Sequence, residues 1–369
     1  MGVSRRRTVV GLVIAMSLLA GSCGGADNAC EYPDDQMNEN GVRVGLALDV
    51  GGIGDKSFND AAKRGLDQAV ADGLASEVNC LEANSTGSNR GENLQALADA
   101  GYDIVIANGF LFSTDIPTIA PDFPDVNFAV TDGFASVLFD DPDTEDFEPG
   151  PDNVADLTFR EHEGSFLVGA TAALVCDCDT IGFLGGQTDA PLIQKFEAGY
   201  VAGAQYINPD MQVLVEYIDP DPAIGFNDAV KGEALSTSMY DAGAELIYHA
   251  AGASGAGLFN AAVKADKLAI GVDSDQYLTA SAEQQPLIVT SMLKRVDTST
   301  YNAIQQTVDG NFASGFQVFG IADEGIDYSQ SNTEFMTPDL IAQIDEIKQM
   351  IVDGSIEVPE VPEGVEPAA

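Results

Sequence analysis

The residues of this chain that could contact a small molecule stand where short apolar segments end. Three such segments are each followed by an aspartate: Asp49, Asp132 and Asp273. Aspartate is also a common turn residue, so each position alone says little, but its recurrence after apolar segments is a stronger signal. In open parallel sheets, ligands bind beyond the carboxyl ends of the strands. The pattern therefore predicts a binding site made from the connections that follow the strands.

The connection after the first apolar segment is rich in glycine and leads into a helix. Its sequence is Asp49-Val50-Gly51-Gly52-Ile53-Gly54-Asp55-Lys56-Ser57-Phe58-Asn59-Asp60. A phosphate-binding loop needs Gly-Lys-Ser, whereas here Asp55 separates Gly54 from Lys56. Two carboxylates in the turn would also repel a triphosphate. This argues against nucleotide hydrolysis, and we expect Asp55 and Lys56 to cap the helix and brace the turn.

The residue types give little support to an enzyme. Ser254 stands among glycines, but Gly252-Ala253-Ser254-Gly255-Ala256 lacks the final glycine of a nucleophile elbow. The chain has two histidines, His162 and His249, which leaves few general bases. We expect no enzymatic activity, no cofactor and no metal centre, and we interpret His249 as a buried structural residue.

The charge balance restricts the partners. The 369 residues include 59 Asp and Glu against 16 Lys and Arg, which gives a formal net charge of −43. Such a surface repels a phosphate backbone, so we expect no binding to nucleic acid. A chain of this length, with 45% hydrophobic residues, is long enough for two globular units with a cleft between them.

The N-terminus predicts export. Three arginines, Arg5 to Arg7, precede an apolar segment at 8–20 that is long enough for a secretory signal and short for a membrane span. Small residues directly precede Cys23, as in bacterial lipoprotein signals, although Ala20 stands where leucine is usual. We expect Cys23 to carry a lipid; ordinary cleavage nearby is the alternative.

Four further cysteines suit an oxidising compartment. We interpret Cys30 and Cys80 as a disulfide that ties the N-terminal tail to the first lobe. Cys176 and Cys178 are separated by one residue, where a bridge is strained. A metal site there would need further ligands, so structural cysteines are the preferred interpretation.

Apolar segments alternate with helical ones, which is typical of parallel βαβ sheets. Strands are predicted at 42–48, 104–107, 128–131, 180–184, 213–217, 245–248, 268–272 and 286–290, and helices at 60–72, 91–100 and 164–175. Three segments lack such periodicity: a polar stretch at 24–40, an acidic stretch at 140–156 and a Pro- and Glu-rich tail from 354.

Several segments together resemble a known family. They are 44–65, Thr131-Asp132-Gly133, 164–169, Gly185-Gly186, 196–200, 249–257, 271–276 and 291–295. In this order, from about 42 to 322, they resemble the basic membrane protein family of bacterial lipoproteins, whose best known members are purine nucleoside receptors of import systems. The strings at 55–59 and 271–276 are the most specific. The tail, the acidic stretch and the Cys-Asp-Cys insertion fall outside the resemblance.

The resemblance implies a type I periplasmic-binding-protein fold, an α/β architecture of two doubly wound parallel-sheet lobes joined by three crossing strands. We place the crossings near 157–163, 277–288 and 318–324. The implied division is a signal peptide at 1–22, a lipid-anchored tether at 23–40, lobe 1 at 41–158 plus 286–320, lobe 2 at 159–285 plus 321–353, and an acidic tail at 354–369.

The resemblance also implies roles for individual residues. A purine is best held by an aromatic ring on each face and polar groups at its edge. The implied ligand-binding residues are Phe58 and Phe226 as the two rings, Asn59 and Asp132 at the base edge, Asp49 in the same turn, Asp273 and Lys294 near the sugar, and Gly252 where a backbone amide approaches the ribose. These roles have alternatives: the two rings could be core residues, and Lys294 could form only an interlobe ion pair with Asp273. A further aromatic residue, Phe196, is interpreted as core.

The expected function follows from the resemblance. An extracytoplasmic lipoprotein, anchored to the cell membrane as a monomer, would capture a nucleoside, in particular a purine nucleoside, and deliver it to an ABC permease and its ATPase subunit. The alternative is a ligand-binding sensor, or a binding protein for a sugar or an amino acid, on the same fold.

Overall fold

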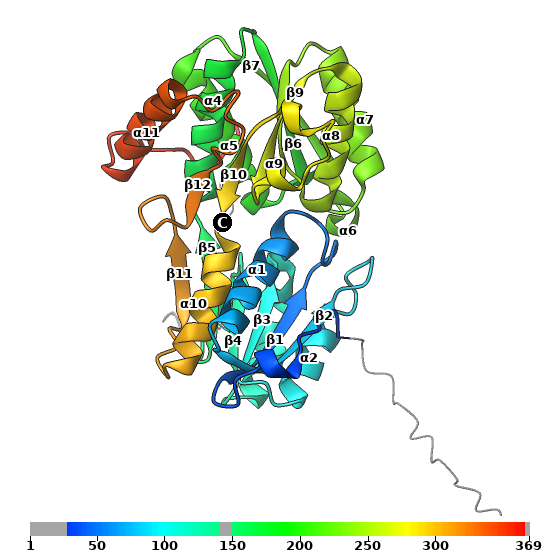
Figure 1. Cartoon of the computed structure of the whole chain (residues 1–369), viewed down its shortest axis with the longest axis vertical. Coiled ribbons are helices and arrows are strands. Elements are labelled where there is room, and N and C mark those ends of the chain that lie inside the picture. Colours follow the sequence, from blue (N-terminus) through cyan, green and yellow to red (C-terminus); the bar gives the residue numbers. More distant parts are fainter. Residues whose placement is uncertain (1–27, 140–149, 366–369) are drawn as a thin grey trace, which may run out of the picture.

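A computed structural model of the chain describes residues 28–139 and 150–365. These residues form two lobes, each built on a six-stranded sheet covered by helices (Figure 1). The predicted architecture of two parallel-sheet α/β lobes is confirmed.

The first lobe carries a sheet in the order β11-β5-β4-β3-β1-β2, with all strands parallel. Its strands are β1 (Val42–Leu48), β2 (Ala75–Glu82), β3 (Ile104–Asn108), β4 (Asn127–Thr131), β5 (Val154–Phe159) and β11 (Gly315–Phe319). Its helices are α1 (Phe58–Ala71), α2 (Arg90–Asp99), α3 (Ile116–Ile119) and α10 (Val296–Val308).

Both faces of this sheet are buried, because side chains alternate along each strand. On β1, Leu46 joins the hydrophobic core that includes α1 and α10, whereas Ala47 joins the core on the α2 side. Apolar side chains therefore cover both faces of the sheet.

The second lobe repeats this plan in the order β12-β10-β9-β8-β6-β7, with β12 antiparallel to β10. Its strands are β6 (Thr180–Gln187), β7 (Gln212–Asp219), β8 (Leu246–Ala250), β9 (Leu268–Asp273), β10 (Ile288–Lys294) and β12 (Ile326–Tyr328). Its helices are α4 (Glu161–Val175), α5 (Pro191–Ile207), α6 (Pro222–Gly225), α7 (Ala229–Asp241), α8 (Ala256–Ala265), α9 (Gln276–Thr279) and α11 (Pro338–Val352).

Helices α4 and α5 pack unusually closely, because glycines face the neighbouring backbone. A Cβ on Gly199 would lie 2.1 Å from the carbonyl oxygen of His162, and one on Gly203 would lie 2.0 Å from that of Phe166. Real side chains do not tolerate such distances, so this contact requires glycine. The close packing fixes the N-terminal turn of α4, which begins where the chain enters the second lobe.

The chain passes between the lobes at three places: at Arg160 between β5 and α4, at Arg295 between β10 and α10, and between β11 and β12. The prediction of a crossing within 277–288, with lobe 1 resuming at 286, is wrong for residues 288–294. Strand β10 pairs in parallel with β9 in the second sheet, with Met292 beside Val272. An apolar strand pattern does not specify which sheet the strand joins, and this choice is tertiary.

The two segments predicted to lie outside the folded body are partly packed on it. Cys30 is buried, and the Ala29 amide donates to the Cys80 carbonyl at 2.8 Å, so residues 28–40 are not a free tether. At the other end, Val358 is buried and a Glu360 carboxylate oxygen lies 3.5 Å from Lys195 Nζ. The acidic stretch predicted at 140–156 also contains the start of β5, at Val154.

Two disulfides are present. The interpretation of Cys30–Cys80 as a disulfide is confirmed, and Cys176 is bonded to Cys178, the short bridge that the sequence disfavours. With these sulfurs bonded to each other, the pair offers no thiolate to a metal. Cys23 lies outside the described residues. Among the helices that the structure describes, none is both long and apolar enough to cross a membrane.

Candidate functional site

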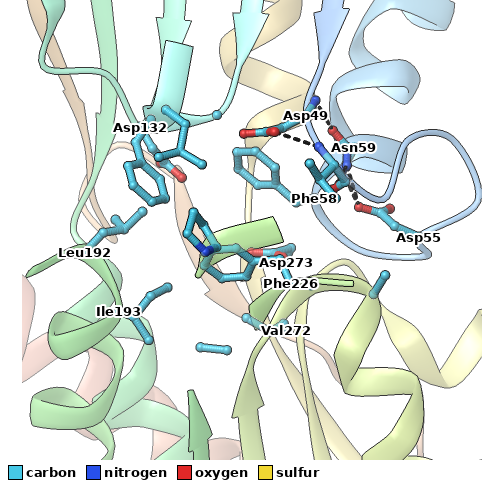
Figure 2. A pocket seen from close by; sticks show the side chains of 18 of the residues that line it. Asp49, Asp55, Phe58, Asn59, Asp132, Leu192, Ile193, Phe226, Val272 and Asp273 are labelled. Carbon is cyan, nitrogen blue, oxygen red and sulfur yellow. Dashed lines mark hydrogen bonds between the residues drawn. The ribbon is translucent and has the colours of Figure 1, made fainter. Parts of the chain in front are cut away.

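A cavity lies between the two lobes, where polar strand-end residues meet (Figure 2). It encloses about 680 Å³ of empty space, part of it open solvent. The eight predicted binding residues all line it: Asp49, Phe58, Asn59, Asp132, Phe226, Gly252, Asp273 and Lys294. The structure thus brings together residues that are up to 245 positions apart in the sequence, from Asp49 to Lys294.

Phe58 reaches the cavity because the glycine-rich turn ends in a capped helix. Asp55 accepts backbone N–H bonds from Ser57 at 2.9 Å, Asn59 at 2.8 Å and Asp60 at 3.1 Å, which satisfies donors at the start of α1. The predicted capping role of Asp55 is confirmed. Burial raises its pKa to about 6, even though these hydrogen bonds favour the ionised form.

Two of the cavity aspartates have an uncommon backbone conformation. Asp132, directly after β4, has φ +59°, and Asp273, the last residue of β9, has φ +62°. Non-glycine residues adopt this left-handed region rarely, and such positions cluster at functional sites, where surrounding structure holds them. Here the two left-handed residues belong to different lobes, and the charges of both carboxylates act on the same buried ammonium group.

That ammonium group belongs to Lys294, the last residue of β10. Its Nζ lies 2.6 Å from Asp132 Oδ1 and 3.0 Å from Glu161 Oε1. The Lys294 side chain is only 2% exposed. Burial alone would lower the pKa of Lys294, but Asp132, Glu161 and Asp273 outweigh this effect and hold it above its usual value, so the group is charged.

Aromatic rings surround the same ammonium. Lys294 Nζ lies 5.3 Å from the centre of the Phe58 ring, 5.0 Å from that of Phe159 and 5.5 Å from that of Phe196. Phe196 belongs to the hydrophobic core, as interpreted from the sequence, and also lines the cavity. The rings exclude water from the ion pairs and therefore strengthen them.

The contacts of Asp132 and Asp273 differ from the grouping of residues expected from the sequence. Asp132 was expected beside Asn59 at the base edge, but its carboxylate accepts from Lys294, which the resemblance puts near the sugar. Asp273 Oδ2 accepts from the Ser57 hydroxyl at 2.6 Å, a hydrogen bond between the lobes. Asp132 therefore belongs with Lys294 in one charged cluster.

Phe226 lines the cavity from the second lobe. Its ring packs on Gly186, where a Cβ would lie 2.3 Å from the ring, and meets Phe110 edge-on at 6.4 Å between centroids. Gly252, in a short 3-10 helix after β8, has φ +52° and presents its backbone to the cavity without a side chain. Figure 2 shows Phe58 and Phe226 near the centre of the view, with Phe58 above Phe226.

The remaining polar groups of the cavity form a second cluster on the first lobe. Asp49 Oδ1 accepts from Arg90 Nε at 2.7 Å. Asn59 Oδ1 accepts from the Asp49 amide at 3.2 Å and from Asn108 Nδ2 at 3.2 Å. Burial raises the pKa of Asp49, and Arg90 opposes this shift. The cavity thus has polar groups in two clusters, with aromatic rings among them.

Arg90 and Glu161 are the charged residues of this region that the sequence analysis missed. Arg90 begins α2 soon after β2, and Glu161 begins α4 directly after β5. Neither β2 nor β5 was predicted as a strand, so the rule of examining strand ends was not applied there. The same rule, applied to a complete set of strands, would have found Glu161, whereas Arg90 lies eight positions beyond the end of β2 and has no such signal.

The comparisons with known proteins agree with this geometry. Residues 42–361 match the family described as "ABC transporter substrate-binding protein PnrA-like". The chain belongs to this family of solute-binding proteins. The match extends beyond residue 322, where the resemblance noted in the sequence ended, and includes part of the packed C-terminal segment.

Two curated relatives and one solved structure illustrate the similarity. The chain is 32% identical to the CD4+ T-cell-stimulating antigen of Listeria innocua, covering 95% of this chain and 97% of that protein. It is 29% identical to the ABC transporter nucleoside-binding protein BmpA of Lactococcus lactis, covering 94% and 98%. A solute-binding protein of Aeropyrum pernix superposes with a TM-score of 0.72 at 27% identity, covering 86% and 94%.

Proposed function

We propose that this substrate-binding protein captures a nucleoside, in particular a purine nucleoside, in the cavity between its lobes. The observation that carries the proposal is the combination of Phe58 and Phe226 on the walls with polar clusters at Asn59 and at Lys294. Flat rings favour a planar base, and separate polar groups suit a ligand with a base at one end and a sugar at the other.

The two clusters suit different parts of a nucleoside. Near Lys294, Asp273 can accept from sugar hydroxyls while the ammonium donates to a sugar oxygen. At the other cluster, the amide of Asn59 and the carboxylate of Asp49 can bind the polar edge of a base. The partnership of Asp132 with Lys294 favours a role for Asp132 on the sugar side.

The proposed activity is capture and delivery without chemical change to the ligand. The partners would be a membrane permease and its ATPase subunit, with the binding protein acting as a monomer. The proposed location is outside the cytoplasm, with a lipid on Cys23 as the membrane anchor. Residues 1–27 lie outside the described structure, so this part of the proposal is supported by sequence pattern and by one relative named as a lipoprotein.

Calorimetric titration tests the ligand. Purified protein would be stripped of bound ligand by unfolding and refolding, then titrated with adenosine, guanosine, inosine, cytidine and uridine. Ribose, arabinose, a mixture of amino acids and 5′-monophosphates would serve as comparison ligands. We expect binding of at least one purine nucleoside and weaker binding of its monophosphate. Tight binding of a sugar or an amino acid, with no binding of any nucleoside, would overturn the ligand assignment and leave the fold intact.

A further inference from the structure

Two buried carboxylates pair with one ammonium group beside the cavity, and a third buried carboxylate acts on it through its charge. Asp132 and Glu161 lie within ion-pair distance of Lys294, at 2.6 Å and 3.0 Å, and their side chains are 4% and 1% exposed. Asp273 is 7% exposed, and its charge acts on both Lys294 and Asp132. If every group were ionised, this charge cluster of Asp132, Glu161, Asp273 and Lys294 would carry two negative charges in excess.

The groups around Glu161 do not remove this excess. On its own helix α4, His162 is buried, and burial lowers its pKa, so it is neutral near pH 7. Lys195 on α5 favours the ionised forms of Glu161 and Asp132, but it is 30% exposed and its Nζ lies 3.5 Å from a Glu360 oxygen, so solvent and Glu360 weaken this effect. Arg64 on α1 acts in the same way on Asp273 only, and it donates to the Ser274 hydroxyl. The hydroxyl groups of Tyr248 on β8 and Ser165 are hydrogen-bonded to each other. Tyr248 is uncharged, because burial raises its pKa. Arg160, before the helix, pairs with Glu163 and is 54% exposed.

Neighbouring carboxylates in a water-excluded site cannot all ionise at low cost. Accordingly, burial raises the pKa of Asp132, Glu161 and Asp273, and Lys294 opposes this rise in each of them. A proton on one carboxylate oxygen would lower the excess charge and could remain hydrogen-bonded within the cluster.

The cluster is divided between the lobes. Asp132 belongs to lobe 1, whereas Glu161, Asp273 and Lys294 belong to lobe 2. Proteins of this architecture open and close about the strands that join their lobes. Opening would return Asp132 to water, where a carboxylate ionises readily at neutral pH. Closure would bring it back against Glu161 and Lys294.

We propose that ligand capture by this protein is coupled to the uptake of a proton, and that Glu161 is the positioning residue responsible. Glu161 is already paired with Lys294 in lobe 2 when closure of the lobes brings Asp132 to the same ammonium group. The proton comes from solvent and binds to one carboxylate oxygen of the charge cluster. This inference rests on the proposed function for its ligand. The residue acts through Lys294 and is not among those that line the cavity.

Calorimetry in buffers of different ionisation enthalpy measures the protons taken up per ligand bound. With the tightest-binding nucleoside, we expect the parent to take up about half a proton or more near pH 7, and its Kd to rise about threefold per pH unit between pH 6.5 and 8. Glu161→Gln should lose most of this uptake and flatten the pH profile. Glu161→Asp, which restores the charge, should recover it.

The control is Glu346→Gln, which removes an exposed carboxylate from α11 in the same lobe and should behave as the parent. Asp55, whose pKa is raised to about 6, remains in all variants, so the difference between parent and Glu161→Gln isolates the charge cluster. If Glu161→Gln does not fold, as judged by circular dichroism, Asp132→Asn is used instead. It removes the lobe 1 carboxylate of the charge cluster and should also abolish most of the proton uptake.

Equal proton uptake in the parent and Glu161→Gln would overturn the inference while leaving nucleoside capture intact. If no nucleoside binds, the proposed function fails instead, and the same titrations are then run with whichever comparison ligand binds. If none binds, the pH dependence of the unfolding temperature is compared for ligand-free parent and Glu161→Gln between pH 5 and 8. Coincident profiles there would also overturn the inference.

Discussion

At the scale of single residues, Phe58 illustrates how position decides a role. An isolated phenylalanine after a glycine-rich turn could equally pack in the core. Here it is the first residue of α1, held at the cavity by the Asp55 cap, and it remains half-buried. A ring in this place has a face available for a planar ligand, whereas a ring within the core would not.

Replacing this ring should therefore weaken binding without unfolding the protein. For Phe58→Ala we expect a loss of about 1–3 kcal/mol of nucleoside binding free energy, the usual range for stacking of a base on an aromatic side chain. Calorimetric titration of the nucleoside measures the loss.

The matched control is Phe316→Ala on β11, the edge strand of the sheet in the same lobe. Phe316 is 50% exposed and does not line the cavity. Its Kd should equal that of the parent. A Phe58→Ala variant that binds as tightly as the parent would exclude stacking on this ring.

At the scale of elements, the two disulfides close loops of very different length. Cys30–Cys80 spans 50 positions, is buried, and fastens the N-terminal segment to β2, the edge strand of the first sheet. Cys176–Cys178 spans two positions at the C-terminal end of α4. Because a disulfide acts mainly by restricting the unfolded chain, the longer loop should contribute more to stability.

Removal of each disulfide tests this difference. The double variant Cys30→Ala with Cys80→Ala should lose about 2–4 kcal/mol of unfolding free energy, the range found for disulfides that close long loops. The variant Cys176→Ala with Cys178→Ala serves as the comparison and should lose much less. Urea denaturation followed by circular dichroism gives both values. A larger loss for the short bridge would contradict the loop-length argument.

At the scale of the whole molecule, acid stability depends on groups buried by the complete fold. His249 on β8 is fully buried, as interpreted from the sequence, and its Nε2 lies 2.9 Å from Gln276 Oε1. Burial lowers its pKa from 6.5 to about 4, so only the unfolded chain binds a proton there between these pH values. The unfolding free energy that it contributes is thus present above pH 6.5 and is lost as pH falls toward 4.

The size of this loss is about 3 kcal/mol, from the difference between the two pKa values. Asp55 acts in the opposite direction, because its raised pKa makes the folded state bind a proton first. The parent should therefore lose about 3 kcal/mol more than His249→Gln between pH 6.5 and 4. Urea denaturation of both proteins at several pH values measures the difference, and parallel pH profiles would show that His249 does not cause acid destabilisation.

The sequence by itself determined the two-lobe α/β class and the eight residues that line the cavity. The fold class rests on local signals, because alternating apolar and helical segments specify parallel strands. The strand-end positions Asp49, Asp132 and Asp273 do so too, because the connection after a parallel strand faces the ligand side. The ordered resemblance to a family supplied the binding roles of all eight residues, which strand ends alone would not have distinguished from ordinary turn and core residues.

Only the tertiary structure decided which residues share a charge cluster and which sheet β10 joins. Strand β10 was predicted, but its place beside β9 depends on pairing with a distant segment. For the same reason the sequence grouped Asp132 with Asn59, while the folded chain pairs it with Lys294 and adds Glu161. Local pattern specifies an element and its buried face, whereas ion pairs between lobes depend on contacts that no short segment contains.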